Sequence, residues 1–187
     1  MTTGRTRAIT VVDYDPSWPR TFETFKARIW PVVRDVALAV EHVGSTAVPG
    51  LAAKPVIDID VIVATPAHVR LAIERLATLG YVHRGDLGVA DREAFASPQG
   101  SPAHHLYVCL RGSLALENHL ATRDFLRQHP EAAATYGRLK KDLAERFPLE
   151  MDRYIDGKTA FVLGVLREAG LRADAVTAIG DVNRRKT

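Results

Sequence analysis

The segment of residues 41–62 restricts the possible folds more than any other part of the chain. A Gly-Ser pair at Gly44 and Ser45 precedes an apolar run, residues 55–63, in which only Asp58 and Asp60 are charged. Burying an unpaired carboxylate is costly, so carboxylates in an apolar strand usually pair, bind a cation or face a wet cleft. The segment therefore predicts a phosphate-binding turn beside a pair of metal-binding carboxylates.

The two aspartates are expected to share one face of a strand. Asp58 and Asp60 are two residues apart, so on a strand over residues 55–63 both side chains project to the same side. Such oxygen pairs suit Mg²⁺ or Mn²⁺, and Mg²⁺ completes its shell with water and substrate phosphate. Two aspartates on a solvent-exposed strand face are the structural alternative, and the upstream turn favours the metal site.

The turn itself has two interpretations. Gly44 allows unusual backbone angles, and Ser45 adds a hydroxyl and an N–H group at the end of a strand. If Ser45 and Thr46 begin a short helix, its first N–H groups favour a phosphate. In the alternative, Ser45 or Thr46 only caps an ordinary strand-to-helix turn.

Capping residues, prolines and glycines divide the chain into a mixed first half and a helical second half. Before residue 112, helices are expected to end near residues 36 and 80, and strands to cover residues 38–43, 55–63, 81–84, 93–97 and 104–110. Three helices then follow at residues 113–128, 130–147 and 150–169. The order predicts an α+β fold with a mixed, helix-flanked sheet in residues 1–112, a helical bundle packed on it in 113–170, and a weakly structured basic tail over 171–187.

Composition excludes several classes of protein. Hydrophobic residues make up 47% and charged residues 25% of the 187 residues, no apolar run reaches membrane-spanning length, and Cys109 is the single cysteine. These features predict a cytoplasmic protein with a buried, reduced thiol and no membrane partner. The net charge is +3, but five basic residues lie at the two ends, so residues 8–183 carry about −2 and predict no long polyanionic partner.

Six motifs occur along the chain: HVGSTAVPGL at residues 42–51, KPVIDI at 54–59, HHLYV at 104–108, RDFLRQHP at 123–130, YGRLK at 136–140 and YIDGK at 154–158. Together they resemble the GrpB family, within the polymerase-beta-type nucleotidyltransferase superfamily. The similarity covers roughly residues 13–169. It implies a nucleotidyltransferase-type sheet and a third carboxylate on a neighbouring strand, which serves as general base or metal ligand.

The chain departs from that pattern at the third acidic position. The candidate strand over residues 104–110 carries no acid, and strand alternation places His104 and His105 on opposite faces. His105 shares the more polar face with Tyr107, so we expect His105 to replace the acid as base or ligand. In the alternative, His104 or His105 only hydrogen-bonds a neighbouring strand or loop.

The remaining candidates are side chains that could bind phosphate or substrate. They are Lys54, Arg92, Lys140, Tyr154 and Lys158, with the last two on one helix face. Together these residues predict a metal-dependent nucleotidyltransferase that moves a nucleoside monophosphate to a hydroxyl acceptor. The alternatives are a non-catalytic nucleotide- or phosphometabolite-binding domain linked to coenzyme A or nucleotide metabolism, and a phosphohydrolase.

Overall fold

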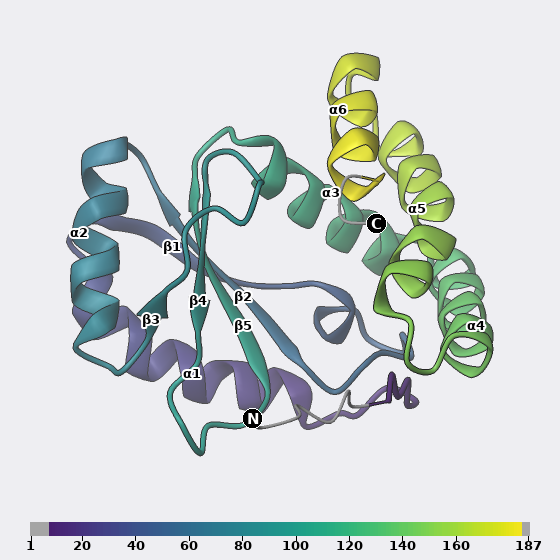
Figure 1. The fold of residues 1–187 in the computed structure, drawn as a ribbon, viewed down its shortest axis with the longest axis horizontal. Helices are drawn as coiled ribbons and strands as arrows, with labels where there is room; N and C mark the ends of the chain where they lie inside the picture. Colours follow the sequence, from purple (N-terminus) through teal and green to yellow (C-terminus); the bar gives the residue numbers. More distant parts are fainter. Residues whose placement is uncertain (1–7, 185–187) are drawn as a thin grey trace, which may run out of the picture.

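The computed structural model describes residues 8–184, and over this range it contains a five-stranded sheet flanked by helices (Figure 1). Its elements are α1 (Trp18–Val33), β1 (Ala37–Val43), the 3₁₀ helix η1 (Ser45–Ala47), β2 (Ile57–Val63), α2 (Pro66–Ala77), β3 (Val82–His83), β4 (Arg92–Ala96), β5 (His104–Leu110), α3 (Leu114–Gln128), α4 (Pro130–Arg146), α5 (Met151–Glu168) and α6 (Ala173–Arg184). The predicted α+β class, with a mixed sheet followed by helices, is confirmed.

The sheet has the strand order β1-β2-β5-β4-β3. β2 and β5 are parallel, and the other neighbours are antiparallel. The parallel register pairs Asp58 with His105 and Asp60 with Tyr107. Because side chains alternate along a strand, these four residues lie on one face of the sheet, which we call the aspartate face.

Helices α1 and α2 cover the opposite face. Ile59 and Leu106 on this face are wholly buried and belong to the largest hydrophobic core. α1 contributes residues at intervals of three or four, which form one apolar stripe: Trp18, Phe22, Phe25, Ile29 and Val33. This core holds the aspartates on the other side of β2, toward the second half of the chain.

The helical half lies against the aspartate face (Figure 1). Leu116 of α3 packs on Ile62 and on the buried Cys109 at one end of that face. α4 and α5 pack on each other through a cluster that includes Leu143 and Tyr154. The helices therefore face the aspartates across the space in which a ligand would lie.

The tail after residue 172 corrects a sequence-based prediction. Residues 173–184 form α6, whereas a weakly structured tail was expected; residues 185–187 lie outside the described range. Ala175, Val176 and Ile179 of α6 are buried, and the latter two pack with Leu166 of α5. These few apolar residues give only a weak helical pattern in the sequence. The helix is stabilised by their burial against α5.

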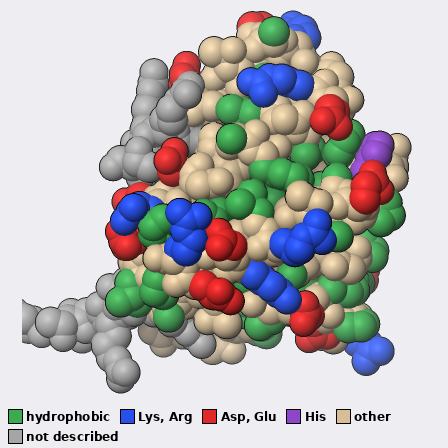
Figure 2. Space-filling view, turned by 90° about the vertical axis from the view of Figure 1, so that its right-hand side faces the viewer, with side chains coloured by type: hydrophobic (Ala, Val, Ile, Leu, Met, Phe, Trp, Pro, Cys, Tyr) green, Lys and Arg blue, Asp and Glu red, His purple; other side chains and the backbone are tan. Residues whose placement is uncertain are grey.

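The outer surface of the helical half carries charges of both signs. Lys and Arg side chains are interspersed with Asp and Glu on this face (Figure 2). The face therefore offers no continuous basic surface to a polyanion. Among residues 8–184, no helix is both long and apolar enough to cross a membrane.

Two glycines of α5 predict opposite responses to alanine. A Cβ atom at Gly157 would lie 2.4 Å from Cδ2 of the buried Leu143, whereas a Cβ at Gly164 meets nothing within 4 Å. We expect Gly164→Ala to raise the free energy of unfolding by about 0.5–1 kcal/mol, because alanine favours the helix. Gly157→Ala should be about 1–3 kcal/mol less stable than that variant because the buried Leu143 side chain must leave the space that the new methyl group takes. Urea unfolding of both variants measures the difference, and equal stabilities would contradict the close α4–α5 packing.

Candidate functional site

The turn after β1 lies directly against Asp58. Gly44 has φ +71°, and a Cβ atom there would lie 2.2 Å from Asp58 Oδ2. Only glycine allows both this backbone angle and this approach. Ser45 then begins η1, so the Gly-Ser turn and the first aspartate form a single unit.

Thr46 belongs to the support of this turn. Its hydroxyl donates to the Val56 carbonyl oxygen at 3.3 Å and lies 3.0 Å from His42 Nε2, and Thr46 is 1% exposed. Burial lowers the pKa of His42 to about 4, so its imidazole is neutral at pH 7. Thr46 also lines a cavity together with Ser45, so its substrate-binding role stays a prediction, with the hydroxyl held by these internal contacts.

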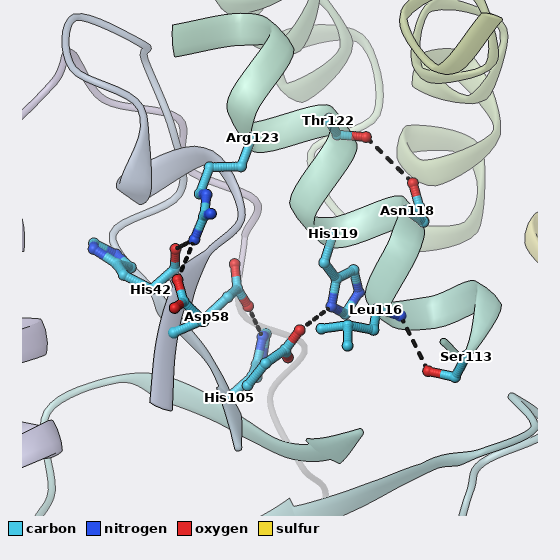
Figure 3. Close-up of polar contacts among 11 residues, drawn as sticks. His42, Asp58, His105, Ser113, Leu116, Asn118, His119, Thr122 and Arg123 are labelled. Carbon is cyan, nitrogen blue, oxygen red and sulfur yellow. Dashed lines mark hydrogen bonds and ion pairs between the residues drawn. The ribbon is translucent and has the colours of Figure 1, made fainter. Parts of the chain in front are cut away.

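Asp58 and His105 form a partly exposed pair at the mouth of the site. His105 Nδ1 lies 2.8 Å from Asp58 Oδ1, across neighbouring parallel strands (Figure 3). An ionised carboxylate can only accept, so Nδ1 carries the hydrogen and Nε2 is left able to accept a proton. His104 lies on the opposite face, buried, with Nε2 2.9 Å from the Tyr81 hydroxyl.

The buried Asp60 and the partly buried His119 form a second pair, deeper in the site. His119 Nδ1 lies 2.7 Å from Asp60 Oδ2 (Figure 3), and Asp60 is 0% exposed. Burial alone would lower the pKa of His119, but the charge of Asp60 and their hydrogen bond outweigh burial and raise it. The negative charge of Asp60 is thus balanced within the protein by His119 of α3. His119 was not among the site residues predicted from the sequence.

Three lysines surround Ser45 and Asp58. Lys140 is 2% exposed, and its Nζ donates to Ser45 Oγ at 2.8 Å. Burial, the nearby positive charge of Lys158 and that of Lys54 lower its pKa to about 7, against the opposing effect of Asp58. Lys54 and Lys158 lie over the ring of the buried Tyr154, at 5.7 and 5.1 Å from its centroid.

Two cavities meet at this cluster. The first has a volume of about 260 Å³ and is lined by Ser45, Asp58, His105 and Tyr154, together with all three lysines. We call it the lysine cavity. The second has a volume of about 280 Å³ and shares Ser45, Asp58, Ile155 and Lys158 with the first. Its other walls include the side chains Asn118, His119, Thr122, Arg123, Tyr136 and Thr159. We call it the helical cavity.

Arg92 lies apart from both cavities. It was expected in a loop as a phosphate clamp, but it is the first residue of β4, is 7% exposed, and has its guanidinium 4.5 Å from the Tyr107 ring centroid. It lines a third cavity, beside α6. The expected loop position is wrong because Arg92 pairs with Cys109 of β5 and so belongs to β4; its role as a phosphate clamp stays a prediction.

The carboxylates fit a divalent cation. Asp58 borders both the lysine and the helical cavities, and Asp60 Oδ1 is buried without a hydrogen-bond partner. An unsatisfied buried carboxylate oxygen is an available ligand for a hard cation. Cys109 also lies within ligand distance of Asp60 and His119, but burial and the charge of Asp60 raise the pKa of its thiol, so it remains a poor ligand.

Sequence reasoning missed two residues of α3 that bind the sheet. His119 contacts Asp60, and Arg123 Nη1 lies 2.7 Å from Glu41 Oε2 and 3.0 Å from the His42 carbonyl oxygen (Figure 3). Both lie at helical spacing with the buried Leu116 and Leu126. The sequence signal that could have identified these two residues is their position, as polar side chains, within an otherwise apolar stripe of the helix.

Comparison with known proteins gives the family. Residues 8–168 match the family model described as GrpB protein, so the chain belongs to the GrpB family. A crystal structure of GrpB from Enterococcus faecalis has a TM-score of 0.77 and 36% identity, covering 86% of this chain and 96% of that one.

Two curated relatives are longer than the matching region. The UPF0157 protein YqkA of Bacillus subtilis is 35% identical over 156 residues, which cover 83% of this chain but 46% of that protein. A protein of Mycolicibacterium paratuberculosis named dephospho-CoA kinase is 27% identical over 192 residues, covering 89% of this chain and 47% of that protein. In both cases the similarity spans about half of the relative.

The contact between Gly44 and Asp58 predicts a specific cost for a side chain there. Gly44→Ala should lower the free energy of unfolding by about 1 kcal/mol or more beyond the cost of Gly50→Ala, because of the clash. Gly50 is the control, with a similar φ of +79° and nothing within 4 Å of a Cβ atom; the excess at Gly44 then contains the clash together with the cost of its ψ of −172°. Urea unfolding measures both variants. Equal destabilisation would mean that the turn does not need its close contact with the carboxylate.

The buried Lys140 predicts a pH dependence of stability. Its pKa is about 7 in the folded protein and 10.5 in its ordinary state, so between these values the unfolded chain binds more protons. Stability should therefore rise with pH from 7 toward 10.5, by up to about 1.4 kcal/mol per pH unit from this group alone. The difference in unfolding free energy between wild type and Lys140→Met should shift in favour of wild type between pH 7 and 9. A difference that is constant over that range would show that Lys140 is not held neutral.

Proposed function

We propose that this GrpB-family chain is a metal-dependent nucleotidyltransferase that transfers a nucleoside monophosphate from a nucleoside triphosphate to a hydroxyl acceptor. The observation that carries the proposal is the composition of the lysine cavity, which is lined by Ser45, Asp58 and three lysines. A carboxylate repels phosphate, and lysines attract it. A magnesium–nucleotide complex satisfies both sets of charges at once.

The residues divide into those that hold phosphate and those that hold the metal. Asp58 and Asp60 would hold Mg²⁺, which supplies charge neutralisation at the phosphates when bound. Ser45 and the backbone of the Gly44 turn donate to phosphate oxygens. Lys140 lies 2.8 Å from Ser45 Oγ, so a phosphate at Ser45 is within reach of its ammonium group and favours its charged form.

His105 provides the proton acceptor. As an acceptor hydroxyl attacks the α-phosphorus in line, a new P–O bond forms, the bond to pyrophosphate breaks, and the hydroxyl proton passes to His105 Nε2. Asp58 accepts from Nδ1 and so orients the imidazole for this role. The helical cavity adjoins the lysine cavity at Ser45 and Asp58, so a small acceptor whose body lies there can extend its hydroxyl to His105 in the lysine cavity.

A second candidate is a nucleotide- or phosphometabolite-binding domain without catalysis. Two observations favour it: β5 carries His105 where the resemblance implies an acid, and a relative that is matched over 47% of its length is named dephospho-CoA kinase. In that case the lysines alone would account for phosphate binding. The two candidates differ in their dependence on metal.

Thermal unfolding with nucleoside triphosphates, with and without Mg²⁺, tests the proposal. Ligands that bind the folded state raise the melting temperature. We expect a nucleotide-dependent rise that requires Mg²⁺, is absent in Asp58→Asn, and needs at least tenfold more nucleotide in Lys140→Met. Asp58→Asn is preferred to a change at Asp60, because Asp60 is buried and holds His119 of α3.

Asp142→Asn is the matched control, because Asp142 is an exposed aspartate on α4 away from the cavities. It should respond like wild type. If no triphosphate changes the melting temperature in Mg²⁺, the nucleotidyltransferase proposal is wrong. A rise that does not need Mg²⁺ and survives Asp58→Asn would establish the binding domain in its place.

A further inference from the structure

Arg92 carries a buried charge that the proposed function does not use. It is 7% exposed, and its Nε atom is buried without a hydrogen-bond partner. Among residues 8–184, the structure pairs no carboxylate with this guanidinium. The nearby Asp60 is already hydrogen-bonded by His119. A buried cation without a paired anion is costly, and the contact with the Tyr107 ring offsets only part of that cost.

A cavity adjoins this charge. It has a volume of about 210 Å³, and Arg92, Asn118 and His119 line its polar side. The other walls are apolar and include Val89, Leu114, Ile179 and Val182, the last two from α6. A pocket with one buried cation and apolar walls is complementary to a ligand with an anionic head and an apolar body.

We infer that this cavity, which we call the α6 pocket, binds a small organic carboxylate through Arg92. The planar guanidinium can pair with a carboxylate through two parallel hydrogen bonds, here from its terminal Nη1 and Nη2 groups, because Nε is buried away from the cavity. The Asn118 amide can donate to the same head group. The short hydrocarbon body of the ligand then packs against α3 and α6.

The α6 pocket is separate from the site at Ser45 and does not rest on the proposed nucleotidyltransferase function. Its contact with that site is through Asn118 and His119, which line both the α6 pocket and the helical cavity. Binding at the α6 pocket can therefore be measured without nucleotide or Mg²⁺. A failure of one proposal leaves the other standing.

To test this, the full chain is titrated with sodium butyrate, and binding is measured by calorimetry and by thermal unfolding. Sodium chloride at equal ionic strength is the reference. Butyrate should raise the melting temperature of wild type above the chloride reference. Arg92→Met should abolish the rise. Arg92→Lys, which keeps the charge but not the fork, should weaken binding at least tenfold. Ala178→Leu, which fills the pocket while leaving Arg92 in place, should also abolish binding.

Arg20→Met is the matched control, since Arg20 is an exposed arginine of α1; it should bind butyrate like wild type. The inference is overturned if butyrate does not bind wild type, or if binding survives Ala178→Leu. Equal or tighter binding of inorganic phosphate would overturn the carboxylate assignment.

Discussion

The parallel pairing of β2 with β5 is the interaction on which the candidate site depends. It joins the strand that carries the aspartates to a strand that begins 41 residues after β2 ends, and its register sets His105 beside Asp58. A shift of one residue would turn His105 to the core and His104 to the aspartates. The apolar face of the same two strands, buried under α1 and α2, holds that register.

Much of the fold could be predicted from residues that act locally. Strand alternation places Asp58 and Asp60 on one face, and Gly44 marks the sharp turn, because these properties depend on a few neighbouring residues. The Asp60–His119 pair joins residues 59 positions apart, so no local pattern specifies it. The burial of Arg92 and the formation of α6 have the same origin: both depend on packing between distant segments.

The electrostatics of the site are divided by depth. In the deeper pair, His119 balances the charge of a fully buried carboxylate, Asp60, whereas both members of the outer pair, Asp58 and His105, are partly exposed. Around the outer pair, Lys140 is destabilised as a cation by burial and by Lys158. An incoming anion relieves that destabilisation, so the lysine cavity is electrostatically incomplete without a ligand.

The contacts of α3 fix the position of the reactive groups, whereas another helix, α5, shapes the cavities beside them. His119 and Arg123 attach α3 to β2 and β1, so the groups that would perform chemistry all lie on the sheet or on a helix bound to it. α5 supplies Ile155 and Lys158 to both the lysine and the helical cavities and packs on α4 through the close contact at Gly157. Changes on the inner surface of α5 can therefore alter the size and shape of what is bound without moving a carboxylate. Proteins with this architecture can therefore come to bind different ligands while they keep the same reactive centre.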